Sequence, residues 1–367
     1  MIIETFNSNQ VGGCIVKITN DSNKAIILDY GLDLDGNEPK ELPSLDNVIG
    51  IIVSHGHLDH IGMLNKVTNI PIYFDEGAYD VYKKYAKHIH KKILKDIVTI
   101  KDGLTIDTFN INLIKTSHSS FNSNMILINV DNKNILYTGD FRLHGWEESD
   151  ELKNIKIDIL ITEGTNIGNN LEAETEESIV EEFRKLQDEY KYIFVMTSST
   201  NSERILSIGK SVKRGRYFII DKFQNELIEC FKKWDNKYNF KKTYYNSRIK
   251  YRFKNRGFTM LVRQGDFFKE IMDEYKNENY ILVYSMWRGY LDNNLGLKEF
   301  VDGYNNSFIH TSGHVSRPDL ERFINDINPE KIMVVHTDDK LIFKNMRIND
   351  NMVTGNKLEF GEKEYGS

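Results

Sequence analysis

Three histidines and an aspartate crowd into the stretch SHGHLDHIGML at residues 54–64, although the whole chain of 367 residues has only 10 histidines. In an extended segment the side chains of His55 and His57 leave on the same face, so both can bind one cation. Asp59 and His60 follow where the helical pattern LDHIGMLNKV begins, and they can bind a second cation beside the first. The spacing therefore predicts a metal site.

Further ligand-type residues stand at the ends of later apolar strands. They are His118 in KTSHSS, Asp140 in YTGDFR and His336 in VVHTDD. Together with the first four residues, and with one shared carboxylate, they suffice for two metal ions and leave room for a water between them. Two ions about 4 Å apart lower the pKa of that water and supply hydroxide at neutral pH. Cys14 and Cys230 lie far apart in sequence and predict no thiolate site.

A second group of residues suits a phosphate. The segment from Ser312 to Pro318 reads SGHVSRP, and Ser316 is predicted to cap a helix that runs to about residue 327. Free amide groups and the positive end of the helix would then face the anion. His314 adds a proton donor for a leaving oxygen, and Glu163 in ITEGT could orient its ring.

Strand and helix patterns divide the chain into two domains. Apolar strands that end in polar ligating residues occupy the first part of the chain and return from residue 307. Between about 168 and 290, strands alternate with helices, which is typical of βα units and a parallel sheet. We therefore predict a discontinuous domain at residues 1–167 and 300–367, with an α/β domain inserted at 168–299.

Composition excludes several classes of protein. A length of 367 residues favours two domains, and 40% apolar with 28% charged residues fits a globular protein. No apolar run approaches the roughly 18 residues of a membrane span. The start MIIETFNSNQVGG lacks the features of an export signal, so we expect a cytoplasmic protein without a membrane partner.

Charge is unevenly distributed. Residues 204–256 hold 16 Lys or Arg and 4 Asp or Glu, a balance of +12, so the rest of the chain sums to −18 to give the net −6. Within this basic segment KKTYYNSRIKYRFKNR interleaves aromatic residues with cations, a composition suited to phosphate contact and base stacking. A solvated basic face explains the same composition, and both interpretations stay open.

At its ligand residues the sequence resembles the metallo-β-lactamase superfamily, whose HxHxDH and later His, Asp and His occur here in the same order. The resemblance implies an αββα sandwich binding two zinc ions, with manganese as the alternative metal. It implies one zinc on His55, His57 and His118, the other on Asp59, His60 and His336, and a bridging Asp140. Asp29 in LDYG matches the family's first aspartate and would orient a ligand. Leu58 stands where the di-iron flavoproteins have an acidic ligand, which disfavours oxygen or NO reduction.

The second half resembles the β-CASP nucleases, and RNase J in particular. Glu163, His314 and His336 match the three extra β-CASP motifs, and STNSERI resembles the nucleotide-contacting segment of RNase J. The fold implied is a metallo-β-lactamase sandwich with an inserted β-CASP α/β domain. YSMWRGYLD replaces the Gly/Ser-rich turn of RNase J, and the chain stops about thirty residues after His336, so the RNase J C-terminal domain is expected to be missing. The resemblance implies catalysis by Asp59, Glu163 and His314, and substrate or phosphate contacts from Ser312, Gly313, His314, Ser316, Asn201 and Arg204.

Three functions compete. The first is a zinc-dependent ribonuclease of RNase J type that acts on single-stranded nucleic acid, with RNA a better candidate substrate than DNA. The second is a small-molecule hydrolase such as a lactonase or thioesterase, which explains neither the inserted domain nor HTSGHVS. The third is a binding module with a dead site, although all seven ligand positions are filled. The sequence leaves open a DNA nuclease, exonuclease or endonuclease action, the metal, and the oligomeric state.

Overall fold

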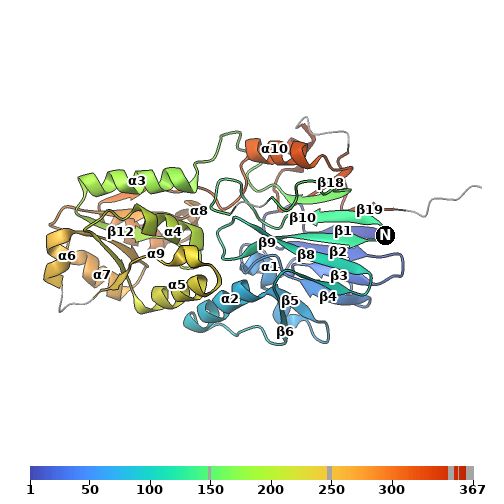
Figure 1. Cartoon of the computed structure of the whole chain (residues 1–367), viewed down its shortest axis with the longest axis horizontal. Coiled ribbons are helices and arrows are strands. Elements are labelled where there is room, and N and C mark those ends of the chain that lie inside the picture. The colour runs from blue at the N-terminus through green and yellow to red at the C-terminus, as the bar shows by residue number, and fades with distance from the viewer. Residues whose placement is uncertain (148–149, 246–249, 346–350, 354, 361–367) are drawn as a thin grey trace, which may run out of the picture. The chain divides into compact units, whose positions relative to one another are not determined.

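A computed structural model of the chain describes residues 1–147, 150–245, 250–345, 351–353 and 355–360. It contains two compact units (Figure 1). The first comprises Met1–Leu143, Glu147–Glu172 and Gly313–Ser367, and the second comprises His144–Trp146 and Ala173–Ser312. The domain boundaries at 167/168 and 299/300 stay a prediction.

Two sheets form the first unit. The order of the first sheet is β19 (Lys357–Glu359), β1 (Ile2–Phe6), β2 (Ile15–Thr19), β3 (Ala25–Leu28), β4 (Val48–Ile52), β5 (Ile72–Asp75) and β6 (Ile97–Ile100). The order of the second is β18 (Lys331–Val335), β11 (Ile159–Glu163), β10 (Lys133–Tyr137), β9 (Ser123–Val130), β8 (Phe109–Thr116) and β7 (Gly103–Ile106). Strands β2 and β3 form an antiparallel pair.

The two sheets pack face to face, because β-branched residues of both point inward. Ile18 and Ile26 of the first sheet share one core with Ile126 and Ile128 of the second. Helices cover the outer faces, as Figure 1 shows for α2 beside β5 and β6. They are α1 (Leu58–Ile61), α2 (Glu76–His88), α10 (Arg317–Ile327) and α11 (Lys340–Asn345), with a 3-10 turn η1 (Leu64–Lys66). The predicted αββα sandwich is confirmed.

Helix ends follow local chemistry. Asp75 caps α2 by accepting a hydrogen bond from the amide of Ala78. Helix α2 ends at His88, and His90 then adopts the left-handed region with φ of 55°. Ser316 caps α10 as predicted, since its hydroxyl accepts from the Asp319 amide.

The second unit is a six-stranded parallel sheet with helices between its strands, as predicted for βα units. Its order is β14 (Thr243–Tyr244), β13 (Tyr217–Ile220), β15 (Phe258–Val262), β12 (Tyr192–Met196), β16 (Tyr280–Tyr284) and β17 (Asn306–Phe308). The helices are α3 (Glu176–Glu189), α4 (Ser202–Ser211), α5 (Lys222–Trp234), α6 (Lys250–Arg256), α7 (Asp266–Asp273), α8 (Gly289–Asn293) and α9 (Leu295–Asp302), with a 3-10 turn η2 (Asn236–Tyr238).

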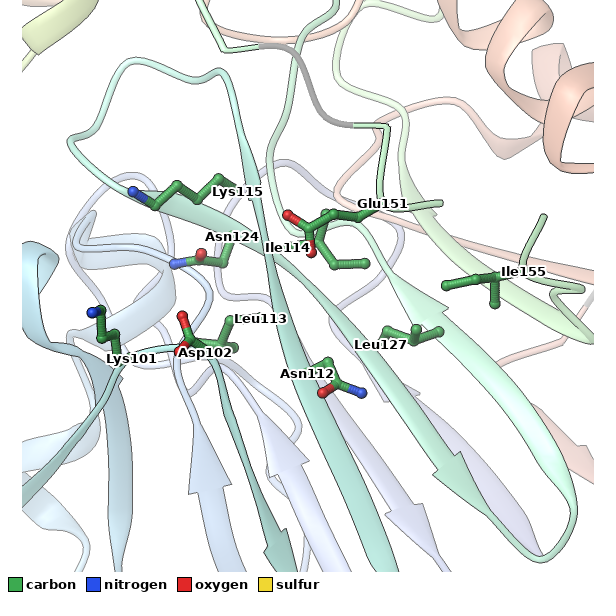
Figure 2. A pocket seen from close by; sticks show the side chains of 10 residues that line it. All are labelled: Lys101, Asp102, Asn112, Leu113, Ile114, Lys115, Asn124, Leu127, Glu151 and Ile155. Carbon is green, nitrogen blue, oxygen red and sulfur yellow. The ribbon is translucent and has the colours of Figure 1, made fainter. Parts of the chain in front are cut away.

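A pocket of about 380 Å³ opens on the first unit (Figure 2). Its lining residues are Lys101, Asp102, Asn112, Leu113, Ile114, Lys115, Asn124, Leu127, Glu151 and Ile155. Two lysines and two carboxylates share this lining, so the pocket has no dominant sign of charge. None of the residues predicted to bind metal or phosphate lines it.

Candidate metal centre

The seven predicted ligands meet because strands of both sheets end at one edge of the sandwich. His55 and His57 follow β4, Asp59 and His60 stand in α1, His118 follows β8, Asp140 follows β10, and His336 follows β18. The ligand atoms of His55, His57 and His118 lie within 4.8 Å of one another, and so do those of Asp59, His60, Asp140 and His336. Residues far apart in sequence therefore form two adjoining groups of metal-ligand type.

The first group contains only imidazoles. Nδ1 of His57 lies 3.1 Å from Nε2 of His55 and 3.1 Å from Nε2 of His118. Atoms that bind a tetrahedral zinc ion at about 2.0–2.1 Å lie roughly 3.3 Å apart, so this spacing suits one ion. The Nδ1–H of His118 donates to the carbonyl of Gly313 at 2.6 Å, which leaves its Nε2 as the ligand atom.

The second group contains the carboxylates. Oδ2 of Asp140 lies 3.2 Å from Nε2 of His60, and Oδ2 of Asp59 lies 3.2 Å from Nε2 of His336. The same Asp140 oxygen is 3.8 Å from Nε2 of His55 and 3.8 Å from Nε2 of His118. Asp140 therefore stands between the two groups, where a bridging ligand would lie.

Two buried atoms show that the site fits a cation. Nε2 of His60 and Oδ1 of Asp140 have no hydrogen-bond partner among the described residues. Because Nδ1 of His60 already bonds to Asp29, its Nε2 is the ring atom that could bind a metal ion beside the Asp140 carboxylate. An unpaired buried polar atom is costly, and a bound metal ion would satisfy both atoms at once.

The electrostatics agree with this fit. Burial holds the pKa of His55 and of His118 well below the usual histidine range, so both are neutral, as metal ligands must be. Burial also disfavours charge on His60, but Asp140, Asp29 and Asp59 outweigh it and hold the pKa of His60 well above its usual value. The carboxylates thus create a field that stabilises positive charge in the second group.

Asp29 contacts the second group through His60, and its orienting role stays a prediction. Its side chain is fully buried, and Oδ2 accepts from Nδ1 of His60 at 2.7 Å. The same oxygen accepts from Ser54 Oγ at 2.6 Å and from the hydroxyl of Tyr137 at 2.7 Å, while Oδ1 accepts from the Ser54 amide at 2.7 Å. Ser54 and Tyr137 were missed in the sequence, although each lies within three residues of a predicted ligand.

Glu163 and His314 form a pair beside the ligands. Oε2 of the buried Glu163 accepts from Nδ1 of His314 at 2.9 Å, and Oε1 accepts from the Phe141 amide at 2.7 Å. Nδ1 of His314 lies 3.8 Å from Asp140. Burial lowers the pKa of His314, but Glu163 and Asp140 outweigh it and raise that pKa to about 9. The ring is 23% exposed, so a substrate can reach it.

Two polar residues missed in the sequence contact His336 and His314. Thr165 Oγ1 bonds Nδ1 of His336 at 2.8 Å. The Asn166 amide donates to the carbonyl of His314 at 3.1 Å. Both follow Glu163 directly in the segment EGTN, so proximity to a predicted catalytic residue was the available signal.

The predicted phosphate contacts fall into both units. Gly313, His314 and Ser316 belong to the first unit, where a Cβ at Gly313 would lie 2.7 Å from Ser119 Oγ. The Ser316 hydroxyl is engaged in capping α10. Ser312 belongs to the second unit, and its carbonyl accepts from His144 Nε2 at 2.9 Å. Phosphate binding by these residues stays a prediction.

Asn201 and Arg204 lie inside the second unit. The side chain of Asn201 caps α4 by accepting from the Arg204 amide at 3.1 Å. The fully buried guanidinium of Arg204 pairs with the fully buried Glu176 at 2.9 Å and donates to the carbonyl of Thr311 at 3.1 Å. Arg204 thus ties α4 to α3 and to the segment after β17, and its contact with substrate stays a prediction.

Many cations of the basic segment have acidic partners. Lys213 pairs with Asp188, Lys250 with Glu274, and Lys254 with Glu278, so acids from outside 204–256 offset part of its charge. Residues 246–249 of the segment lie outside the described residues. Whether the segment binds nucleic acid stays a prediction. Among the described helices, none combines the length and the apolar character needed to cross a bilayer.

Two family profiles match the chain. A beta-lactamase superfamily domain matches residues 24–190, and a Zn-dependent metallo-hydrolase RNA specificity domain matches residues 305–344. The first match contains every predicted ligand except His336, which lies with His314 in the second. The two matches therefore cover all seven candidate ligands together with Glu163 and His314.

Curated relatives are distant ribonucleases. A probable RNase MJ4 of Methanocaldococcus jannaschii is 30% identical over 211 residues, covering 48% of this chain and 48% of that protein. Ribonuclease J 2 of Streptococcus pyogenes is 33% identical over 146 residues, or 34% of this chain and 25% of that protein. Ribonuclease J of Mycoplasma genitalium is 27% identical over 213 residues, covering 51% of this chain and 37% of that protein. The chain thus matches about half the length of these relatives, or less.

A solved structure shares the fold over nearly the entire chain. The crystal structure of a protein of unknown function from Enterococcus faecalis V583 aligns with a TM-score of 0.76 and 17% identity, covering 97% of this chain and 99% of that one. The sandwich, the α/β unit and the His/Asp groups agree with both profile matches. The chain belongs to the β-CASP branch of the metallo-β-lactamase superfamily, a family of metal-dependent hydrolases.

Proposed function

We propose that the protein is a zinc-dependent ribonuclease, a phosphodiesterase of RNase J type that acts on single-stranded RNA. The observation that carries this proposal is the Glu163–His314 pair beside Asp140. A hydrolase of esters with good leaving groups needs no second proton donor, whereas a ribose oxygen leaves poorly without a proton. The RNA specificity profile over residues 305–344 supports RNA as substrate.

Two zinc ions, or two manganese ions in their place, would be bound by the two groups of candidate ligands. His55, His57 and His118 would bind one ion, Asp59, His60 and His336 the other, and Asp140 both. When bound, such ions neutralise phosphate charge and lower the pKa of water.

The chain's own residues supply the proton. As the oxygen of water bonds to phosphorus and the bond to the leaving oxygen breaks, Nε2–H of His314 gives its proton to that leaving oxygen. Glu163 holds Nδ1–H and so keeps the ring in place. Asp59, the other predicted catalytic residue, is 13% exposed at the site, where its carboxylate would take the proton that the attacking water loses. The cytoplasmic location stays a prediction.

The test is His314→Ala. A general acid contributes about 10²- to 10⁴-fold, so the variant should lose roughly that much rate on end-labelled RNA while keeping its metal. On bis(p-nitrophenyl) phosphate, whose leaving group needs no proton, the defect should be far smaller. His90→Ala, at an exposed position after α2, is the matched control.

The outcomes separate the alternatives. Equal defects on both substrates would mean that His314 positions phosphate and donates no proton. A wild type that hydrolyses bis(p-nitrophenyl) phosphate but no RNA would remove the ribonuclease function. Parallel assays of RNA and DNA with a 5'-phosphate or a 5'-hydroxyl would show the preferred nucleic acid and end.

A further inference from the structure

Aromatic rings and a cation gather where two neighbouring strands of the second unit end. Trp287, Arg288 and Tyr290 follow β16, and Phe308 is the last residue of β17. The strands are parallel, with Tyr284 paired to Phe308. We call Trp287, Arg288, Tyr290 and Phe308 the ring cluster. It lies at the carboxyl edge of the sheet, the edge at which open α/β sheets bind ligands.

The rings are exposed, and each has an aromatic or cationic neighbour within the cluster. Trp287 is 56% exposed, Tyr290 55% and Phe308 37%. The rings of Trp287 and Tyr290 lie 5.4 Å apart, edge to face, and the guanidinium of Arg288 lies 4.1 Å above the ring of Phe308. Single exposed apolar residues are common, but such a group of large rings indicates a binding surface.

The surrounding backbone holds the cluster in place. A Cβ at Gly289 would lie 2.3 Å from the indole of Trp287, so the ring rests directly against this glycine. The hydroxyl of the buried Tyr284 donates to the carbonyl of Trp287 at 3.2 Å, and its ring stacks beneath Phe308 at 6.3 Å. Because the rings are already ordered, a ligand that stacks on them loses little binding free energy to ordering.

The charge of the cluster favours nucleic acid over an apolar partner. Arg288 is exposed, and within the described residues no carboxylate forms an ion pair with it. Arginine binds phosphate and also stacks on planar rings, and aromatic faces beside arginine are the usual platform for unpaired bases. Phe308 lies inside the match to the RNA specificity domain at residues 305–344.

We propose that the ring cluster is a binding site for unpaired bases of single-stranded RNA. This inference rests on the proposed ribonuclease function, because it names a contact for that substrate. Trp287 offers its exposed face to a base, and Arg288, which lies over the ring of Phe308, contacts a neighbouring phosphate. Stacking of this kind accepts any base, so the site adds affinity for unpaired RNA without reading its sequence.

The experiment measures binding of the full chain to a labelled, phosphorothioate-linked oligouridylate by fluorescence anisotropy. Stacking on an aromatic ring contributes about 1–3 kcal/mol per base, so Trp287→Ala should weaken binding roughly 5- to 150-fold. Trp287→Phe should keep most of the affinity. Gly289→Ala, which suits a helix but displaces the indole, should weaken binding in the same direction. Phe267→Ala, at a ring 53% exposed outside the cluster, should have no effect.

An abasic oligomer of the same length tests stacking directly. The abasic oligomer should bind the wild-type protein more weakly than oligouridylate does. The Trp287→Ala substitution should not weaken binding of the abasic oligomer further, because the two changes remove the same contact, as in a double-mutant cycle. For Arg288→Gln we expect the slope of the logarithm of the binding constant against the logarithm of the salt concentration to be shallower by about 0.7. This is the contribution of one phosphate contact on a single strand.

Several results would overturn the proposal. One is an equal loss for Trp287→Ala and Phe267→Ala, and another is an equal loss on abasic and base-bearing oligomers. Unchanged RNA affinity together with altered sedimentation of Trp287→Ala would assign the cluster to a contact between protein chains. Binding that depends on Trp287 in a protein that cleaves no RNA would remove the ribonuclease function and leave the base site standing, so the two failures are distinguishable.

Discussion

The hydroxyl of Tyr137 offers a test of how the metal centre is supported. It donates to Oδ2 of Asp29 at 2.7 Å, the oxygen that also accepts from Nδ1 of His60. Tyr137→Phe removes this one oxygen atom and leaves the ring in the core between the two sheets. The ligand atoms themselves are untouched, so any change in metal affinity must come from the loosened Asp29 and His60.

The size of the effect follows from the contacts. A hydrogen bond to a charged group contributes about 1.5–3 kcal/mol. Asp29 keeps two bonds from Ser54 and one from His60, so we expect the lower end, about 1.5 kcal/mol, or roughly tenfold weaker binding of metal at the second group. Residues that support metal ligands contribute about 10- to 100-fold in affinity, which agrees with this figure.

The assay is competition for zinc between the metal-free protein and a chromogenic chelator, with denaturant unfolding measured in parallel. Tyr238→Phe is the control, because its buried hydroxyl donates to the neutral Ser202 Oγ at 3.1 Å in the second unit. Both variants should lose some stability, but only Tyr137→Phe should lose zinc affinity. Zinc affinity within twofold of wild type in both would refute the supporting role of Tyr137.

Three further predictions concern other parts of the chain. His57→Ala and Asp140→Ala should each reduce the amount of bound metal, measured by elemental analysis, and should each abolish hydrolysis. Full metal occupancy in both variants would refute the two-group site. The double variant Arg252→Glu and Lys254→Glu should make the slope of the logarithm of RNA affinity against the logarithm of salt concentration shallower by about 1.4. An unchanged slope would mean that the basic segment is a solvated face and does not bind RNA. Burial lowers the pKa of Lys340 to about 8, whereas an unfolded lysine has about 10.4. Between about pH 8 and about pH 10.4 the unfolded chain therefore binds more protons than the folded protein, so the free energy of unfolding should rise with pH in this range. Lys340→Met should make the melting temperature rise less with pH over the same range.

The convergence of the candidate ligands was predictable from the sequence for a geometric reason. Each stands just after an apolar run, and strand ends in one sandwich converge at an edge, so His118, Asp140 and His336 could be assigned to one site from their place after strands. Their pairing distances could not be derived, because the register between β10, β11 and β18 depends on packing of the whole core.

The directions of the side chains and their supporting contacts were beyond sequence reasoning, because both depend on the shape of the backbone. Asp29 and His336 adopt left-handed conformations, with φ of 57° and 53°, that turn their side chains from strand ends toward the site. Tyr137 reads as an ordinary apolar strand residue, and only its position opposite Asp29 reveals a hydrogen bond. Arg204 looks like a phosphate ligand in STNSERI, yet the fold surrounds it with Glu176 and backbone carbonyls.

The basic segment shows the limit of counting charges. Its +12 balance in the sequence predicts strong attraction to phosphate, but acids from elsewhere in the chain pair with several of its cations, and a paired cation has less charge left for a polyanion. The ring cluster has few charges and stands out only when exposure and ring geometry are known. If both proposals hold, affinity for RNA depends on stacking more than net charge suggests, and loss of Trp287 should weaken binding at high salt by nearly the same factor as at low salt.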